Sequence, residues 1–330
     1  MFKRSMLLLG AVFILIIAAA CSNTPVKQEQ KQEQEKEETP AANQNETRVV
    51  QDMFGEVTIP VKPKNLLVSS SNYAEYLIEM GIAPQYALVV PEIEPDYRKP
   101  YLEKNGVELM TTQQYDFNYE KLLSLSPDLI IVPGQGMEKN VYDELSKIAP
   151  TVALDANSGM HIAMSKLAQL FDKKAESDKV LVEFDKKAAE AKEKIHQAIG
   201  DKTVLVLRVE PRRYRYLGPK SEDDVSKFFY ETLGLKSPEL IKDSTEWFTP
   251  LSLELLPEIN PDYVFLEKRS MENYDSSDSL KELEDSSLWK HLDAVKNNGV
   301  FPLRTNDYIQ AKGPIGTSML IDYIVEKLVP

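Results

Sequence analysis

Short apolar runs alternate with helix-like segments along most of the chain. Buried strands are predicted at 65–70 (NLLVSS), 86–90 (YALVV), 128–134 (DLIIVPG) and 151–155 (TVALD) in the first half, and at 203–210 (TVLVLRVE), 262–268 (DYVFLEK) and 300–304 (VFPLR) in the second. Helices are predicted over 73–80, 138–148, 221–233 and 314–328. Strands that alternate with helices indicate an α/β fold with parallel-type sheets.

The two halves contain a matching stretch, NYEKLLSLSPDLII at 118–131 and SLELLPEINPDYVF at 252–265. Each stretch predicts a short helix, a turn carrying Pro-Asp, and a buried strand. The matching positions are Glu120/Glu254, Leu122/Leu256, Pro127/Pro261 and Asp128/Asp262. Because their spacing is close to half of a folded body of about 280 residues, the repeat indicates two similar lobes.

A long helix without proline is predicted between the two halves, over 176–199. Its apolar positions keep a three- and four-residue spacing and form one stripe, namely Leu181, Phe184, Ala188, Ala191, Ile195 and Ile199. A helix of this length spans roughly 36 Å. A coiled-coil helix is the alternative, but the stripe is too brief for sustained heptads. A single strut that joins two lobes fits the pattern better.

The start of the chain has the pattern of an export signal. Lys3 and Arg4 precede an apolar run over 6–20, which is short for a membrane span. The run ends in Ala-Ala-Ala-Cys at 18–21, which resembles a bacterial lipobox and implies that Cys21 becomes the lipid-modified first residue. An ordinary secretory signal with a chance cysteine is the alternative. Cys21 is the only cysteine, so disulfides within the chain are excluded.

Three parts of the chain differ in composition: a polar segment near its start, an acidic body, and one basic cluster within that body. Residues 22–47 hold almost no large apolar side chains, which predicts a flexible tether. The net charge is −13, and about −15 without Lys3 and Arg4, which argues against nucleic acid as a partner. RVEPRRYRY at 208–216 nevertheless places four arginines in nine positions.

The basic cluster follows an apolar run, so it is predicted to leave the end of a strand, where α/β proteins bind their ligands. On an extended segment Arg213 and Arg215 share one face, while Arg212, Tyr214 and Tyr216 share the other. A solvated basic loop on the surface is the alternative.

The sequence offers little for catalysis or for a bare metal ion. It contains no Gly-x-Ser-x-Gly elbow and no GxxxxGK[ST] motif, and the Gly-x-Gly in PGQGMEKN lacks the rest of a dinucleotide fingerprint. The three histidines are scattered, so any metal is expected to arrive wrapped in a chelator. We therefore expect a binding protein rather than an enzyme.

Several motifs together resemble the siderophore-binding lipoproteins of Gram-positive bacteria, which are substrate-binding subunits of ABC importers for iron complexes. The resemblance covers about residues 48–330 and rests on DMFGEVTIPVKPKNLLVSS, LSPDLIIVPG, YDELSKIAPTV, LVLRVEPRRYRYLGP, SLWKHLDAVKNNGVFPL and the long helix. It implies two Rossmann-like lobes joined by one long helix, with the ligand in the cleft between them and small lobe motion. It also implies a monomer without a cofactor of its own, anchored by Cys21 to the extracytoplasmic face of the cell membrane.

The resemblance divides the chain into five parts. These are a signal peptide (1–20), the lipidated cysteine and tether (21–47), an N-terminal lobe (48–160, the N-lobe), a bridging helix region (161–199) and a C-terminal lobe (200–330, the C-lobe). The implied partners are a ferric siderophore and a permease dimer with its ATPase subunits. Haem or cobalamin is the alternative ligand, and a siderophore-processing enzyme on the same fold is the alternative activity.

The resemblance also names ligand residues. It implies first Arg208, then Arg213 and Arg215. Further candidates are Tyr214, Arg304, Tyr308, Lys312, Tyr115, Trp247, Tyr73 and Lys139, followed by Arg98, Gln135 and Arg269. Guanidinium groups suit oxygen-rich anions, so a citrate-hydroxamate or carboxylate siderophore is expected.

Glu120 and Glu254 occupy equivalent positions in the repeat. The resemblance implies that each lobe carries an exposed glutamate that docks with arginines of the permease. The alternative is a carboxylate that interacts favourably with the N-terminal end of a short helix.

Overall fold

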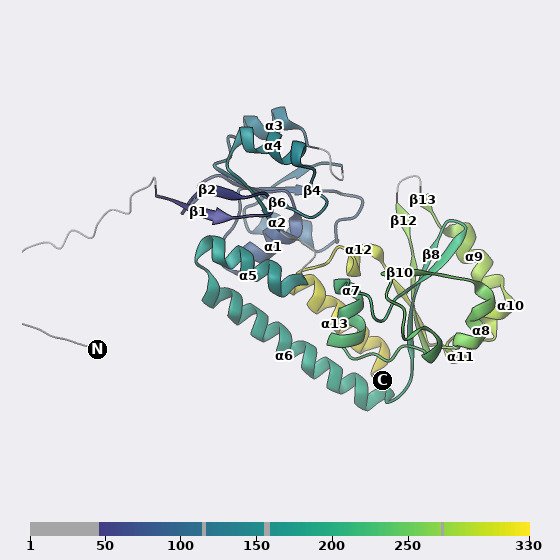
Figure 1. Ribbon diagram of the computed structural model, residues 1–330. Coiled ribbons are helices and arrows are strands. Elements are labelled where there is room, and N and C mark those ends of the chain that lie inside the picture. The colour runs from purple at the N-terminus through teal and green to yellow at the C-terminus, as the bar shows by residue number, and fades with distance from the viewer. Residues whose placement is uncertain (1–45, 114–116, 155–158, 272–273) are drawn as a thin grey trace, which may run out of the picture. The chain divides into compact units, whose positions relative to one another are not determined.

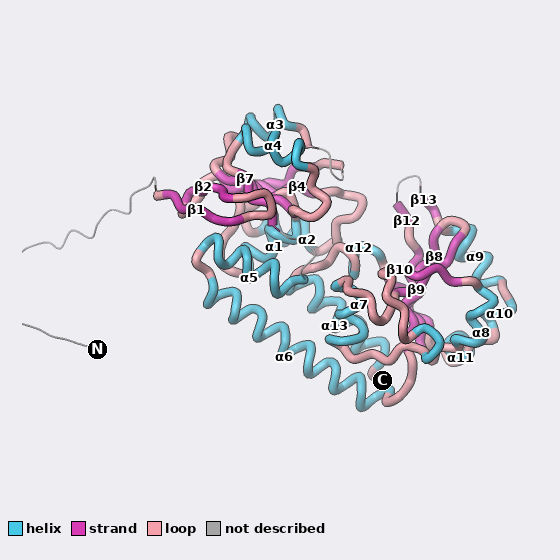
Figure 2. Tube along the Cα trace, in the orientation of Figure 1, coloured by secondary structure: helices cyan, strands magenta, loops and turns pink. Residues whose placement is uncertain are grey.

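Two five-stranded sheets form the framework of the protein in the computed structural model, which describes residues 46–113, 117–154, 159–271 and 274–330 (Figures 1 and 2). The predicted signal peptide, Cys21 and nearly all of the predicted tether lie outside the described residues. Among the described helices, none combines the length and the apolar character that crossing a membrane requires.

The N-lobe sheet is parallel throughout, with the strand order β5-β4-β3-β6-β7. Its strands are β3 (Leu66–Val68), β4 (Tyr86–Val89), β5 (Glu108–Thr111), β6 (Leu129–Pro133) and β7 (Thr151–Leu154). Its helices are α1 (Ser71–Glu79), α2 (Arg98–Lys104), α3 (Tyr119–Ser124) and α4 (Lys139–Ile148), and an antiparallel hairpin of β1 (Thr47–Gln51) and β2 (Glu56–Pro60) precedes them. The predicted strands of this half are confirmed, and β5, α2 and the hairpin are additional.

Helices cover both faces of the N-lobe sheet. One core cluster joins the sheet to α1, α2 and α5 (Gly159–Phe171), and a second joins it to α3 and α4. This arrangement explains why the strands read as continuous apolar runs, since both of their faces are buried.

The C-lobe sheet is mixed, with the strand order β10-β9-β8-β11-β14. Its strands are β8 (Val204–Glu210), β9 (Arg213–Leu217), β10 (Phe248–Leu251), β11 (Tyr263–Lys268) and β14 (Val300–Leu303). β8, β11 and β14 are parallel, whereas β9 and β10 run antiparallel to their neighbours. The expectation of parallel-type sheets is therefore confirmed for the three predicted strands of this half, β8, β11 and β14, and wrong for the pairings of β9.

The segment RVEPRRYRY is a hairpin rather than a loop leaving a strand. β8 continues to Glu210, and Pro211 and Arg212 alone form the turn into β9. Arg212 has a φ of 61°, the left-handed conformation that the third position of a type II turn requires after proline. The predicted alternation is confirmed on β9, where Tyr214 is buried in the core and Arg213 lies on the opposite face.

Short helical segments fill the rest of the C-lobe. They are α7 (Asp224–Lys227), a π-helical turn (Phe228–Thr232), 3-10 turns at Glu239–Ile241 and Leu253–Leu255, α8 (Leu256–Ile259), α9 (Ser277–Asp285), α10 (Ser287–Lys290), α11 (Asp293–Lys296), α12 (Thr305–Tyr308) and α13 (Pro314–Leu328). β12 (Ser270–Met271) pairs with β13 (Tyr274–Asp275). The helix predicted over 221–233 is thus divided at Phe228, while the one over 314–328 is confirmed.

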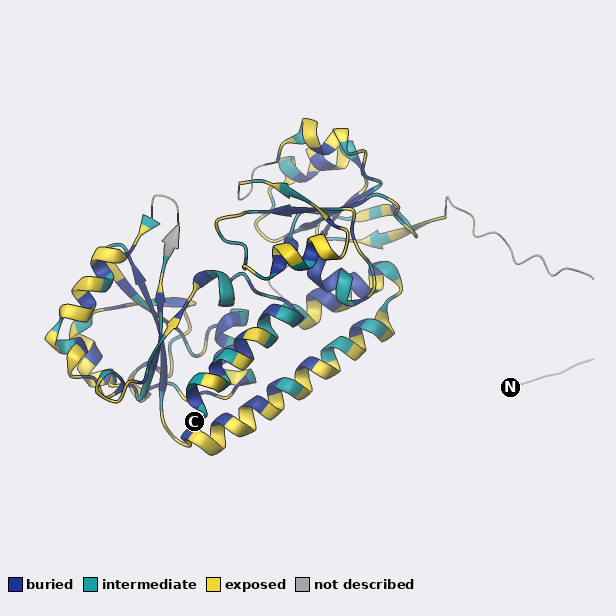
Figure 3. Ribbon diagram, turned by 180° about the vertical axis from the view of Figure 1, so that it is seen from behind, coloured by how far each residue is buried: buried dark blue, intermediate teal, exposed yellow. Residues whose placement is uncertain are grey.

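The predicted strut is α6 (Lys174–Ile199), about 39 Å long at 1.5 Å per residue. Leu181 packs against the N-lobe core, whereas the later stripe residues Phe184, Ala188 and Ile195 belong to the C-lobe core. Its other face is exposed along most of its length, and α13 packs beside it (Figures 1 and 3). One helix therefore contributes to both cores, which confirms the strut.

The repeat has the same structural role in each lobe. Asp128 accepts hydrogen bonds from the backbone nitrogens of Lys64 (2.6 Å) and Asn65 (3.0 Å), directly before β3. Asp262 accepts one from the backbone nitrogen of Thr203 (2.8 Å), directly before β8. Each Pro-Asp turn thus binds the start of a neighbouring strand, β3 or β8, which pairs with the strand that follows the turn, β6 or β11. The prediction of a repeated helix, turn and strand is confirmed.

Candidate functional site

A cavity of about 520 Å³ opens at the carboxyl ends of strands from both sheets. The N-lobe contributes residues at or after the ends of β3, β4 and β6, and the C-lobe contributes residues after β11 and β14. The C-lobe also contributes Asp223, Asp224 and Trp247, from the segment between β9 and β10. Among its lining residues are Asn72, Tyr73, Tyr76, Trp247, Arg269 and Lys312. This is the edge at which α/β sheets bind their ligands.

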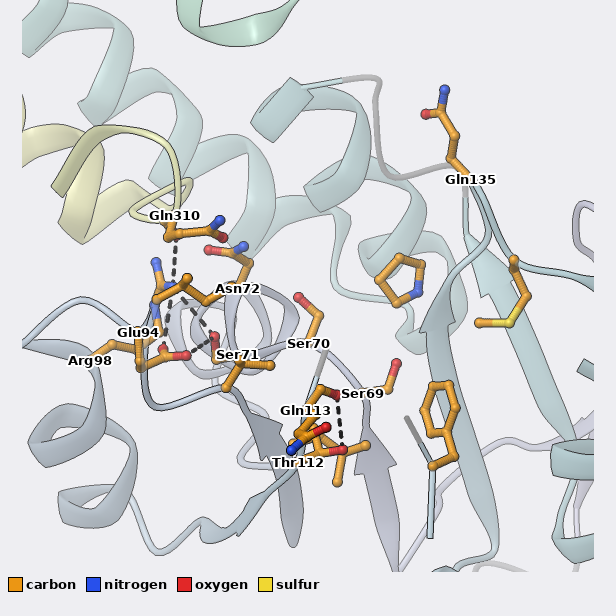
Figure 4. Close-up of a pocket in the computed structure, with 16 residues that line it drawn as sticks. Ser69, Ser70, Ser71, Asn72, Glu94, Arg98, Thr112, Gln113, Gln135 and Gln310 are labelled. Atoms are coloured by element: carbon orange, nitrogen blue, oxygen red, sulfur yellow. Dashed lines mark hydrogen bonds and ion pairs between the residues drawn. The ribbon is translucent and has the colours of Figure 1, made fainter. Parts of the chain in front are cut away.

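The N-lobe side of the site is polar but largely uncharged. A second cavity of about 260 Å³ lies there, lined by hydroxyl and amide side chains from the ends of β3, β5 and β6 (Figure 4). They include Ser69, Ser70, Asn72, Thr112, Gln113 and Gln135, and the charged pair Arg98 and Glu94 lines the same cavity. Such groups both donate and accept hydrogen bonds, so this side suits neutral oxygen and nitrogen groups.

Arg98 is the buried cation of the N-lobe, and acidic groups outnumber it. Its Nε donates to Glu75 (3.0 Å), and its Nη1 lies 3.5 Å from Glu94. Nη1 also donates to the backbone oxygen of Gln310 (2.9 Å), a contact drawn in Figure 4. Burial raises the pKa of the Glu94 carboxyl. One arginine with two carboxylates leaves one negative charge when both are ionised.

This N-lobe pair also anchors the segment that leads into α13. Glu75 accepts a hydrogen bond from the backbone nitrogen of Ile315 (3.0 Å), in the first turn of that helix. Gly313 lies so close to Glu75 that any side chain there would overlap the carboxylate. The Tyr76 hydroxyl donates to the backbone oxygen of Lys312. The buried ion pair of the N-lobe is thus occupied with holding two parts of the chain together.

The C-lobe side of the larger cavity carries Arg269 and Lys312 together with Asp223 and Asp224. A concentration of arginines arises on this lobe from alternation on three adjacent strands. Arg208 lies opposite Arg215 in the β8–β9 register, and Glu210 lies opposite Arg213. On the other side of β8, Arg208 is paired with Glu267. Cross-strand partners share one face of a sheet. We call these residues, together with Arg269 just beyond β11, the arginine cluster.

Arg208 forms the buried base of the arginine cluster, with 1% of its surface exposed. Its Nε donates to Glu267, and its Nη2 donates to the Tyr308 hydroxyl (3.1 Å). The guanidinium stacks on the Phe248 ring, 3.5 Å from its centroid, and Trp247 lies next to it at 5.7 Å. Burial raises the pKa of Tyr308 well above its ordinary value, so this hydroxyl stays protonated and donates to Glu267.

Glu210 lies at the centre of the arginine cluster and is fully buried. Its Oε2 accepts a hydrogen bond from the Nε of Arg213. Its Oε1 lies 3.6 Å from Arg215, 3.7 Å from Arg269 and 3.9 Å from Arg208, measured to each Nη1. Four arginines and the two carboxylates of Glu210 and Glu267 leave two positive charges.

The structure brings some predicted site residues together and separates others. Trp247, Arg269, Lys312 and Tyr73 line the larger cavity, and Gln135 lines the smaller one. None of these positions tests a role in binding, so each role stays a prediction.

Other predicted residues lie elsewhere. Tyr214 is buried in the core, where its hydroxyl donates to the backbone oxygen of Ser279 (2.8 Å). It therefore lies on the face of β9 opposite Arg213 and Arg215, the other candidates on this strand. Lys139 pairs with Asp143 on its own helix. Arg304 is exposed and pairs with Asp96 of the N-lobe (2.8 Å). Tyr115 lies outside the described residues.

The two glutamates of the repeat are both exposed. Glu120 lies in the first turn of α3, and Glu254 lies in the 3-10 turn that precedes α8.

The buried glutamates that pair with the arginines were not predicted from the sequence. Glu210 stands inside RVEPRRYRY, and a period of two from Arg208 would have put both on one face. Glu267 and Glu75 gave no comparable signal, because their partners come from other strands and helices. Among the described residues, no group of three or more His, Cys, Asp or Glu side chains is placed to hold a metal ion.

Comparisons with known proteins agree on one family. The model of the periplasmic binding protein family matches residues 68–306. The chain is 30% identical over 334 residues to the iron(3+)-hydroxamate-binding protein YxeB of Bacillus subtilis, covering 99% of this chain and 97% of the relative. It is 32% identical over 332 residues to the iron(3+)-hydroxamate-binding protein FhuD of the same organism, covering 97% of each.

Solved structures show the same architecture. The crystal structure of Staphylococcus aureus SirA complexed with staphyloferrin B superposes with a TM-score of 0.71. It is 26% identical in sequence, and the match covers 86% of this chain and 98% of SirA. The expected fold of two lobes joined by a long helix is therefore confirmed.

Proposed function

Because the chain belongs to the periplasmic binding protein family, we propose that it is the substrate-binding subunit of an ABC importer and captures a ferric siderophore outside the cell. The family consists of binding proteins, in agreement with the expectation that the chain is not an enzyme. YxeB and FhuD are named for binding iron(3+)-hydroxamates, and SirA was solved with staphyloferrin B. These relatives support the siderophore as the ligand class.

One observation carries the choice among siderophores: the surplus of two positive charges in the arginine cluster. Guanidinium groups bind carboxylates through two parallel hydrogen bonds and stay charged when they are desolvated. The N-lobe side offers mainly hydroxyl and amide groups, beside the ion pair of Arg98 and Glu94. An anionic ferric complex with both carboxylate and neutral chelating groups matches these two sides, so a citrate-hydroxamate or carboxylate siderophore is the proposed ligand.

The proposed ligand contacts come from the arginine cluster, of which Arg269 lines the larger cavity. Arg213, Arg215 and Arg269 are partly or largely exposed, and each could turn a guanidinium edge toward an anion. Arg208 is buried against Phe248, with Trp247 next to it, so contact with a ligand requires neighbouring side chains to move. Tyr73, Lys312 and Tyr308, together with Arg304, Lys139 and Tyr115, complete the proposed set.

The two tryptophans provide the test. Trp247 lines the larger cavity and is 39% exposed, whereas Trp289 is 5% exposed in the C-lobe core. Titration of the mature protein with a panel of ferric siderophores should quench its fluorescence. Trp247→Phe should lose most of the quenching, and the matched variant Trp289→Phe should keep it. A protein that binds no ferric complex of the panel would contradict the proposed function.

Delivery to the membrane is proposed to use Cys21 and the two repeated glutamates. A lipid on Cys21 would hold the protein at the extracytoplasmic face of the membrane, and exposed Glu120 and Glu254 would dock with the permease. Iron uptake should fall in Glu120→Ala and Glu254→Ala and fall furthest in the double variant, with ligand affinity unchanged. Glu258→Ala, an exposed glutamate on α8, is the control. Normal uptake by the double variant at equal abundance would exclude this docking.

A further inference from the structure

Glu210 is surrounded by more positive charge than it can bind through hydrogen bonds. Four guanidiniums lie within 4 Å of its carboxylate, but its Oε1 makes no hydrogen bond among the described atoms. A buried charge acts over such distances because the Coulomb energy falls only with the first power of distance, in a medium of low dielectric constant. Its electrostatic influence therefore exceeds what its hydrogen bonds suggest.

At least two of the four arginines are held by other groups. Arg208 donates to Glu267 and Tyr308 and stacks on Phe248. Arg215 donates to the backbone oxygen of Phe248 from both Nε (2.9 Å) and Nη2 (2.6 Å). These guanidiniums would keep their positions without Glu210. What Glu210 supplies to them is mainly a negative charge.

A carboxylate at this position competes with the ligand for the same donors. An anion bound beside the arginine cluster is attracted by the guanidiniums and repelled by Glu210, which already offsets one of them. A neutral complex experiences neither effect strongly. The charge of Glu210 therefore changes the affinity for anionic complexes more than the affinity for neutral ones.

We propose that Glu210 is a specificity-determining residue, which sets the surplus charge of the arginine cluster at two and so selects the charge of the bound complex. This inference rests on the proposed function, because it concerns the ligand site described above. It assigns the selection to a residue that need not touch the ligand.

The test compares affinities for an anionic and a neutral probe, ferric citrate and ferrichrome. Glu210→Gln keeps the shape of the side chain and raises the surplus to three. The ratio of the two association constants, anionic over neutral, should rise about tenfold, as expected for one unit charge at this range. Glu258→Gln removes the same charge from an exposed position of the same lobe and should leave the ratio unchanged.

A charge-restoring variant separates this effect from a structural one. Glu210→Gln combined with Arg213→Gln returns the surplus to two, and Arg213→Gln alone lowers it to one. The double variant should regain the ratio of the parent, and the single arginine variant should fall below it. If Glu210→Gln does not fold, these two variants still test the proposal, because they differ from each other only at residue 210. An equal ratio in the two would overturn it.

A third measurement does not depend on a ferric ligand. Iron-free citrate should raise the thermal unfolding midpoint of Glu210→Gln more than that of the parent. It should likewise raise the midpoint of the double variant more than that of Arg213→Gln. If the parent binds no ferric complex of the panel, the proposed function fails while this comparison still judges Glu210. Equal shifts would contradict the role of Glu210.

Discussion

Each lobe buries an arginine against a glutamate, but the two sites differ in charge and in use. Arg98 is outnumbered by Glu75 and Glu94, and its Nη1 also donates to the backbone of Gln310, in the chain that leads into α13. Arg208 belongs to a cluster in which arginines outnumber glutamates by two. A buried arginine is therefore not by itself a sign of a binding site. Since Arg98 also lines a cavity, it is the surplus of positive charge that separates the arginine cluster from the anchor.

The largest expected effect concerns the anchor. Arg98→Ala leaves Glu75 buried without its cation, and breaking a buried pair from one side costs about 3–5 kcal/mol of unfolding free energy. Denaturant unfolding measures the loss. The paired replacement Glu75→Gln with Arg98→Met should recover part of it, because no unpaired charge remains. If Arg98→Ala were as stable as the parent, the N-lobe pair would not be an anchor.

The next effect sharpens the comparison on the ligand side. Arg269→Ala removes one guanidinium from the cavity wall, so affinity for an anionic ferric complex should fall about ten- to a hundredfold, as for one hydrogen bond to a charged group. Titration calorimetry measures it. The control is Arg212→Gly, which removes an exposed arginine from the hairpin turn and suits its positive φ. Equal losses in both variants would point to general charge rather than to the cluster.

The smallest effect concerns the exposed ion pair between Arg304 and Asp96. The hydrogen bond from Arg304 lowers the pKa of Asp96. The contribution of the pair to the free energy of unfolding is therefore present above the ordinary pKa of 3.8 and is lost as the pH falls through the lowered value. Exposed pairs contribute less than about 1 kcal/mol. Asp96→Asn should change unfolding free energy by no more than that at pH 7. A loss as large as that of Arg98→Ala would show that this pair, too, is an anchor.

The sequence predicts features that depend on local periodicity. The period of two placed Arg213 and Arg215 on one face, the apolar stripe marked α6, and the bounds of α13 agree with the predicted helix. The hairpin was missed because its turn places an arginine, not the usual glycine, at the position of positive φ.

The partners of the buried arginines depend on long-range pairing. Glu267 reaches Arg208 only through the β8–β11 register, and Glu75 reaches α13 only once residues some 240 positions apart have packed together. No local pattern encodes such contacts. The sequence therefore indicates where positive charge is concentrated, while the tertiary structure decides how much of it is neutralised.

The salt dependence of binding tests the central claim most directly. Tryptophan quenching gives the affinity of the mature protein for ferric citrate and for ferrichrome at about 0.05 M and about 0.5 M NaCl, conditions between which screening of partly exposed charges increases strongly. If the surplus charge of the arginine cluster selects the ligand, the protein binds the anionic complex more tightly, and this preference shrinks as salt is added. Tighter binding of ferrichrome, with neither affinity changing with salt, would contradict the account.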